Sequence, residues 1–344
     1  MSAETSIALA DELEGVAPPF QALGLVGHED VYARLVKQLA DRRLPGGILL
    51  HGPKGIGKAT LAYQLAIEIF SVTGDEPEGR VIEQVRGGAH PNLYSLGRRL
   101  RERGGGFYSE IRVDDMRQTL RQLQQTRGRP GHRILVVDAM EDCNRNAANA
   151  LLKTLEEPPS DTLVILVSHR PGRLLPTIRS RCQAHAMRAL DDEQVKQVLL
   201  GADMEQNAVA QAVRLAGGRP RRGFEALAMG QSKLLNSLAD WLKAPGESPG
   251  ENLLKLAEGL ADKKNLTENG FAREMLLDWI AQSVTNAALH LPDTRQAVNS
   301  ANALWEQANK LFEQTDTYNL DAKQCLIILF DEIIDHTKLI HSNS

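Results

Sequence analysis

A glycine-rich segment that ends in lysine is the clearest chemical signal in the sequence. After the apolar run 48–51, the residues HGPKGIGKAT match the pattern Gly-x-x-x-x-Gly-Lys through Gly52, Gly57 and Lys58, with Gly55 as a further glycine inside the loop. Glycines let backbone N–H groups wrap a phosphate, a helix N-terminus attracts anions, and the lysine reaches the terminal phosphates. The segment predicts a nucleotide-binding loop. A glycine-rich turn without a ligand is the alternative interpretation.

The position after the lysine lacks the oxygen that this chemistry normally uses. A Ser or Thr there would ligate Mg²⁺, but the residue is Ala59. Thr60 supplies the nearest hydroxyl, one position late and on a different side of the expected helix. We therefore expect ATP or ADP binding with weakened magnesium coordination, and no required cofactor.

A second apolar run, ILVVD, ends in Asp138, where an aspartate would hold the magnesium shell of a nucleotide. The next residue in an active ATPase of this kind is normally Glu, which activates the attacking water, and here it is Ala139. Glu141 should lie beyond the strand end and is a poor substitute. A helix cap or a solvated loop acid is the alternative interpretation of Asp138. Because Ala59 and Ala139 affect the same chemistry, we expect a nucleotide-binding fold that has lost hydrolysis.

Length and composition limit the remaining possibilities. The 344 residues predict two to three domains, and the net charge of −4 excludes a protein whose whole surface binds polyanions. Aromatic residues make up 4% of the chain, which argues against stacking platforms for single strands. Three scattered cysteines indicate neither a disulfide framework nor a zinc site. Because the sequence shows no signal peptide and no membrane-spanning segment, we expect a soluble cytoplasmic protein.

The elements needed to position these residues are short buried strands alternating with helices. Apolar runs predict strands at 48–51, 93–96, 134–137 and 163–168. Helical spacing predicts helices at 59–70, 114–127 and about 146–157, the last of which Pro158 and Pro159 should end. After about residue 190 only helical patterns remain. The fold class is therefore a parallel α/β sheet with flanking helices, followed by all-α domains.

Composition shifts suggest four segments. We expect a flexible N-terminal tail over 1–21, a P-loop domain over 22–190, a small helical lid over 191–232 and a helical, oligomerising collar over 233–344. Within the P-loop domain, residues 74–106, with their run of three glycines, suggest a flexible insertion.

From Asp138 onward, the sequence strongly resembles a known family. It reads DAMEDCNRNAANALLKTLEEPPSDTLVILVSHRPGRLLPTIRSRCQ. This is similar to the AAA+ clamp-loader subunits of bacterial DNA polymerase III, in which LLKTLEEPP precedes a sensor strand and a Ser-Arg-Cys motif. The acid–alanine pair at 138–139 resembles the delta-prime branch, whereas the gamma/tau ATPase has Asp-Glu there. The resemblance extends over most of 22–190, including LVGHEDVYARL and His90-Pro91-Asn92.

The resemblance implies a stator that helps load the sliding clamp onto primed DNA in DNA replication. Its partners would be the other clamp-loader subunits, gamma/tau and delta, with no membrane involved. Arg181, within Ser180-Arg181-Cys182, would act as an arginine finger in trans in a neighbour's ATP site. A surface salt bridge is the alternative role for Arg181. An active gamma/tau-type or other AAA+ ATPase is the alternative function.

The resemblance also implies two sensor positions. Ser168 ends a predicted strand where the family carries its first sensor, and the adjacent His169 is an equal candidate. One of Arg219, Arg221 and Arg222 falls near the family's second sensor.

The predicted insertion departs from one feature of the family. Several members carry a four-cysteine zinc module, but residues 72–110 contain no cysteine, so we expect no zinc. Arg98, Arg99, Arg101 and Arg103 lie there instead, either as a solvated loop or as a patch for DNA phosphates or an acidic partner.

Overall fold

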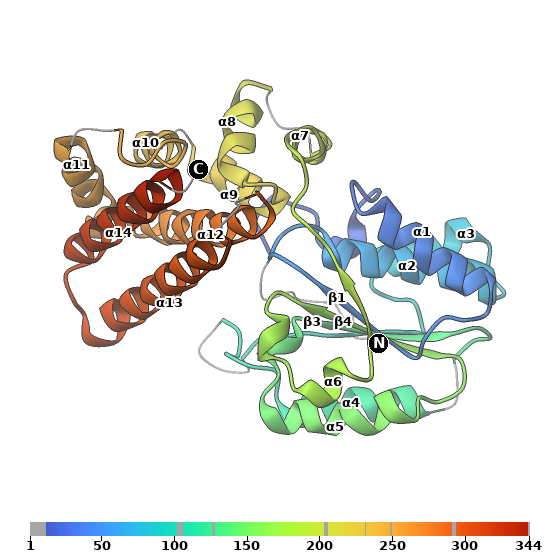
Figure 1. Ribbon diagram of the computed structural model, residues 1–344. Helices are drawn as coiled ribbons and strands as arrows, with labels where there is room; N and C mark the ends of the chain where they lie inside the picture. Colours follow the sequence, from blue (N-terminus) through green and yellow to red (C-terminus); the bar gives the residue numbers. More distant parts are fainter. Residues whose placement is uncertain are drawn as a thin grey trace. The chain divides into compact units, whose positions relative to one another are not determined.

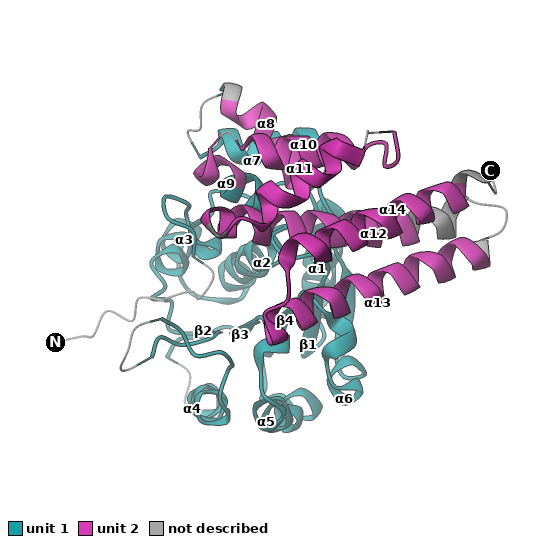
Figure 2. Cartoon of the chain, turned by 90° about the vertical axis from the view of Figure 1, so that its left-hand side faces the viewer, with its two compact units in different colours: residues 1–206, 218–225 teal, residues 207–217, 226–344 magenta. Residues whose placement is uncertain are grey.

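A computed structural model describes residues 12–101, 106–125, 128–202, 206–230, 232–247, 250–290 and 294–342. The chain divides into two compact units, residues 1–206 with 218–225 and residues 207–217 with 226–344 (Figure 2). The predicted lid, 191–232, contributes residues to both units. The division into tail, P-loop domain, lid and collar stays a prediction.

The first unit is built on a five-stranded parallel sheet in the order β2-β3-β4-β1-β5 (Figure 1). The strands are β1 Gly47–His51, β2 Leu93–Leu96, β3 Arg133–Asp138, β4 Thr162–Ser168 and β5 Gln183–Ala186. Each of the four predicted strands is present. The central strands β3 and β4 are almost wholly buried, which is why they read as continuous apolar runs in the sequence.

Helices cover both faces of this sheet (Figure 1). On one face lie α1 Glu29–Ala40, α2 Lys58–Thr73 and α3 Glu78–Arg86, and on the other lie α4 Val113–Gln124, α5 Arg145–Glu156 and α6 Pro176–Arg179. Successive side chains of β1 alternate between the two cores, with Ile48 and Leu50 in the first and Leu49 in the second. The fold class predicted for this part of the chain is confirmed.

The helix α5, expected over about 146–157, is Arg145–Glu156 in the structure. The side chain of Asn144 accepts a hydrogen bond from Ala147 N at 2.9 Å, which satisfies one free N–H of the first turn. The helix ends at Glu156, two residues before Pro158-Pro159. Both ends of α5 are therefore set by local chemistry.

The interpretation of residues 74–106 as a flexible insertion is wrong for the part that contains α3 and β2. Val81 and Val85 of α3 are 1% and 0% exposed in the core beside α2. Strand β2 pairs with β3 from Leu93 to Leu96. Val81 and Val85 lie one helical turn apart, so α3 buries an apolar stripe and belongs to the domain.

The end of the predicted N-terminal tail is packed onto the first unit. The short 3-10 helix η1, Pro19–Gln21, places Phe20 edge-on to Tyr63 with ring centroids 5.8 Å apart. The side chain of Gln64 donates to the Ala22 carbonyl at 3.2 Å. Residues 1–11 of that predicted tail lie outside the described residues.

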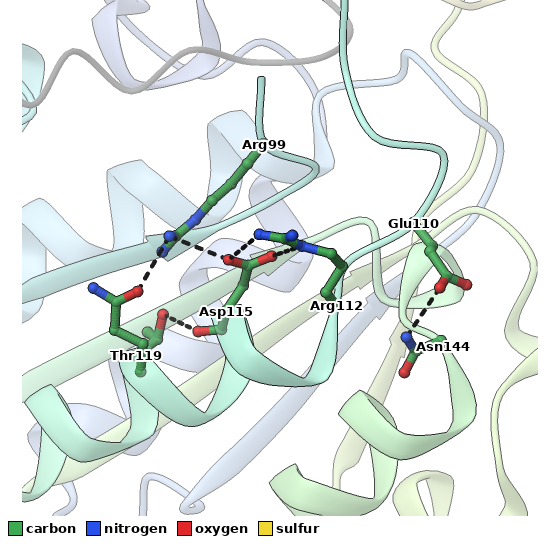
Figure 3. Close-up of polar contacts among 7 residues, drawn as sticks. Arg99, Glu110, Arg112, Asp115, Thr119 and Asn144 are labelled. Atoms are coloured by element: carbon green, nitrogen blue, oxygen red, sulfur yellow. Dashed lines mark hydrogen bonds and ion pairs between the residues drawn. The ribbon is translucent and has the colours of Figure 1, made fainter. Parts of the chain in front are cut away.

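Two arginines of the predicted basic patch form ion pairs within the domain. Arg98 Nε lies 2.9 Å from Asp142. Arg99 Nη1 lies 3.2 Å from the buried carboxylate of Asp115 (Figure 3). Arg112 meets the same carboxylate through two hydrogen bonds of 3.1 and 3.3 Å. Arg103 lies outside the described residues. The patch is thus partly neutralised by the domain's own acids.

After β5, the described residues form helices and the connections between them, as predicted. These helices are α7 Asp192–Leu200, α8 Gln206–Ala216, α9 Pro220–Met229, α10 Lys233–Trp241, α11 Gly250–Ala261, α12 Leu266–His290, α13 Thr294–Tyr318 and α14 Ala322–Ser342. Leu260 of α11, Leu276 and Ile280 of α12 and Phe330 of α14 are at most 1% exposed and form a core of the second unit. Among the described helices, none combines the length and apolar character that crossing a bilayer requires.

Candidate functional site

The glycine loop leaves the carboxyl end of β1 and enters α2, as its sequence predicts. Gly52 follows His51 with φ +151°, and a Cβ added there would lie 2.1 Å from the carbonyl oxygen of Met187. The loop passes this close to the chain after β5 because Met187 N donates to the His51 carbonyl at 2.7 Å. Only glycine fits the first position of the loop.

Lys58 is buried at the first turn of α2, with 3% of its surface exposed. Its Nζ donates to the carbonyl oxygens of Gly52 at 2.9 Å and Pro53 at 2.5 Å. Burial lowers the pKa of Lys58 to about 8, while the charges of Asp138 and Glu141 oppose that shift. The lysine therefore lies close to both acids that the sequence singled out.

The two acids occupy different positions. Asp138 is the last residue of β3, and Glu141 lies in the 3-10 helix η2, Met140–Asp142, just beyond it. Glu141 Oε1 accepts the backbone N–H of His169 at 2.7 Å. This carboxylate is therefore held against the end of β4, and Ala139 occupies the position between the two acids.

The remaining candidates in this site lie at the ends of β1 and β4 and on α2. Ser168 is fully buried beside His51 in the sheet register, and its Oγ accepts the N–H of Arg170 at 3.2 Å. Ala59 packs against the core on the α2 face. Thr60 is half-buried in the next position of the same turn. The structure brings Ser168 to the same edge of the sheet as the glycine loop.

The arginines that follow Gly217-Gly218 differ in their surroundings. Arg221 N donates to the Gly55 carbonyl at 3.2 Å, and a Cβ on Gly55 would lie 2.5 Å from Arg221 Cβ. The Arg221 guanidinium pairs with Glu225 at 2.9 Å, and Arg222 is buried. Arg219 is the lid arginine whose positive charge contributes to lowering the pKa of Lys58. The start of α9 therefore packs directly on the loop.

Arg181 lies at the other edge of the sheet. In β5, which follows it, Gln183 pairs with Ile48 at the start of β1. A Cβ added to Gly47 would lie 3.3 Å from the carbonyl oxygen of Arg181. The glycine loop begins only after His51, so the structure separates Arg181 from the loop of its own chain by the length of β1.

The side chain of Arg181 is anchored on one side and open on the other. Its Nη1 donates to the Thr177 carbonyl at 2.9 Å, and its Nη2 contacts Glu156 Oε1. One third of the side chain stays exposed. A groove of about 540 Å³ adjoins this segment and includes Arg179 and Ser180 in its lining.

Metal and thiol chemistry have little support in the described residues. Within them, no group of three or more His, Cys, Asp or Glu side chains is arranged to hold a metal ion. Burial raises the pKa of Cys143 to about 12 and that of Cys182 to about 11. Both thiols are therefore protonated and unreactive at neutral pH.

Sequence reasoning missed three features of these two sites. Strand β5 has no apolar run because it is a four-residue edge strand with partly exposed side chains. The proximity of Glu141 to Lys58 and the pairing of Glu156 with Arg181 are contacts between separate elements. The LEEPP and Ser-Arg-Cys motifs were both visible in the sequence, but nothing in it indicated that they meet.

The chain is similar to known proteins in its sequence and in its fold. Residues 27–191 match the family model described as "DNA polymerase III, delta subunit". The DNA polymerase III subunit delta' of Pseudomonas aeruginosa is 36% identical over 189 residues, which cover 50% of this chain and 52% of that protein. The delta' subunit of Escherichia coli is 31% identical over 198 residues, covering 55% and 56%.

A crystal structure of a DNA polymerase III gamma subunit-related protein from Thermotoga maritima is also similar. It shares 18% identity and a TM-score of 0.40, with 89% of this chain and 99% of that chain covered. The chain spans about half the length of the delta' proteins that it matches. Over residues 27–191, where the family model matches, the chain is therefore similar to the DNA polymerase III delta' subunits of bacteria.

Proposed function

We propose that the chain is a stator of a DNA polymerase III clamp loader that supplies Arg181 to the ATP site of a neighbouring subunit. It would bind the gamma/tau and delta subunits and, through the complex, the sliding clamp and primed DNA. Its helices after residue 232 would form the collar that joins the subunits. The observation that carries this proposal is the location of Arg181 at the sheet edge opposite its own glycine loop.

The separation supports action in trans. Arg181 lies beside Gly47, and the loop begins at Gly52, five residues farther along. A strand rises about 3.3 Å per residue, so the two points are separated by about 16 Å along β1. An arginine side chain is shorter than that. A guanidinium held at this edge can contact a nucleotide bound by another subunit and donate two parallel hydrogen bonds to its phosphate oxygens.

The surroundings of the glycine loop support a subunit that does not hydrolyse ATP. Ala139 replaces the residue that would activate water, and Ala59 replaces the oxygen that would ligate magnesium. Glu141 lies near Lys58, but its Oε1 is already bound by His169 N–H. Gly52, Gly55, Gly57, Lys58, Thr60, Asp138 and Ser168 remain the candidate nucleotide contacts, and Arg219 is the favoured second sensor.

Reconstitution with the other loader subunits tests the role of Arg181. Arg181→Ala should leave assembly intact and lower DNA-stimulated ATP hydrolysis by about 10³-fold, the lower end of the effect of arginine fingers in GTPases. Arg173→Ala is the matched control, since Arg173 is exposed in the 3-10 helix η3, Pro171–Arg173, of the same segment. Unchanged hydrolysis in Arg181→Ala complexes would refute the proposal.

The purified chain tests the alternative of an active ATPase. We expect no ATP turnover at rates typical of motor subunits. Turnover at such rates, lost in Lys58→Ala, would show that the chain is itself a motor.

A further inference from the structure

Two motifs that lie 25 residues apart in the sequence meet at the edge of the sheet where Arg181 is found. Glu156 is the last residue of α5, within LLKTLEEPP, and Arg181 follows α6, within Ser-Arg-Cys. Their side chains form an ion pair between Glu156 Oε1 and Arg181 Nη2. We propose that Glu156 is a positioning residue that orients Arg181 toward the neighbouring subunit. This inference rests on the proposed role of Arg181 in trans.

The backbone that carries the Glu156 side chain is fixed by packing at the end of α5. Leu151 and Leu155, in the last two turns of α5, are 0% and 6% exposed in the core beneath it. Glu157 N donates to the Lys153 carbonyl at 3.0 Å and closes the helix. Pro158 then packs close to Gly46, the residue just before β1. The backbone position of Glu156 is therefore determined by the core and the sheet.

Arg181 is held at two points. The Thr177 carbonyl accepts a hydrogen bond from Nη1 at 2.9 Å, and the Glu156 carboxylate forms an ion pair with Nη2. A guanidinium has five N–H donors, so two anchored donors leave three for a ligand. The exposure of one third of the side chain is consistent with open donors on the outer side. The pair holds the guanidinium while leaving it accessible.

The same contact could instead withhold the arginine from a partner, and the structure favours orientation. Glu156 is 48% exposed, so water screens its charge and weakens its hold on the cation. An arginine without anchors samples many rotamers, which it must lose when it docks on phosphate. A weak, directional contact that removes those rotamers in advance assists docking.

Variants at Glu156 in the reconstituted complex test the inference. In Glu156→Ala we expect kcat of the stimulated ATPase to fall about 3- to 5-fold, the size of one half-exposed ion pair, with KM for ATP unchanged. Glu156→Gln should recover most of the rate, because its amide oxygen still accepts from Nη2. Glu157→Ala is the matched control, since Glu157 is the exposed neighbour at the helix end.

The outcomes separate this inference from the proposed function. Combining Glu156→Ala with Arg181→Ala should add nothing to Arg181→Ala alone, because Glu156 acts only through Arg181. A higher kcat in Glu156→Ala would show that the pair withholds the arginine, and an unchanged kcat, a raised KM or lost assembly would equally overturn the inference. If Arg181→Ala itself has no effect on hydrolysis, the proposed role of Arg181 in trans is refuted, and the inference about Glu156 is refuted with it.

Discussion

Replacing Asp115 with alanine should loosen the segment that joins β2 to α4. The Asp115 side chain is 6% exposed and lies between two arginines (Figure 3). Arg99 approaches it at 3.2 Å, and Arg112 donates to both of its oxygens at 3.1 and 3.3 Å. Arg112 also lies over the ring of Tyr108, 4.2 Å from its centroid. One buried carboxylate thus holds two cations, Arg99 and Arg112, that lie between β2 and α4.

The magnitude follows from these contacts. Each hydrogen bond to a charged group contributes about 1.5–3 kcal/mol when it is buried. Arg99 and Arg112 are 45% and 41% exposed, so water solvates them again once the carboxylate is gone, and only part of that energy is lost. We expect Asp115→Ala to lower the free energy of unfolding by about 2–3 kcal/mol, which shifts Tm by about 4–12 °C for a domain of 150–250 residues.

Thermal unfolding of the full chain measures this effect, and hydrogen exchange of peptides covering 97–112 locates it. Asp114→Ala is the matched control, because Asp114 is the exposed acid beside Asp115 in the first turn of α4. Losing an acid at a helix N-terminus costs about 0.3–1 kcal/mol. An Asp115→Ala shift no larger than that of Asp114→Ala would refute the reasoning. It would show that the arginines are ordered without their carboxylate.

Two further predictions concern protonation and the glycine loop. Burial lowers the pKa of His90 to about 4 from its ordinary 6.5. Its Nδ1 accepts a hydrogen bond from Asn92 N–H at 3.3 Å. The folded state therefore binds a proton on the His90 imidazole less readily than the unfolded state does. Stability should fall as the pH drops from 6.5 toward 4, and unfolding curves of His90→Phe, which keeps an aromatic ring against Phe70, should show a weaker dependence. Gly52→Ala places Cβ 2.1 Å from Met187 O, whereas Gly57→Ala, at φ +99°, meets no atom within 4 Å. Denaturant unfolding should show that Gly52→Ala lowers the free energy of unfolding by about 1–3 kcal/mol more than Gly57→Ala does, because the backbone at Met187 must move. Equal stabilities of the two variants would contradict the close approach of Gly52 to Met187.

The local parts of the fold could be predicted because their signals are local. Strands β3 and β4 are buried on both faces, so they appear as continuous apolar runs. Pro158 and Pro159 predict the end of α5, and the helix ends at Glu156, because proline disfavours a helical residue before it. Strand β5 escaped prediction because an edge strand of four residues carries too little apolar sequence to stand out from a loop.

The sequence by itself determined the chemical groups available: a phosphate loop with Lys58, the missing oxygen at Ala59, the missing acid at Ala139, and a candidate arginine at 181. These follow from residue type and short spacing, which the chain carries whatever its tertiary structure. Only the tertiary structure decided that Arg181 lies away from its own loop, that Glu156 contacts it, and that Asp115 neutralises Arg99. Such pairings depend on the order of strands in the sheet and on helix packing, which bring together residues that no local pattern connects.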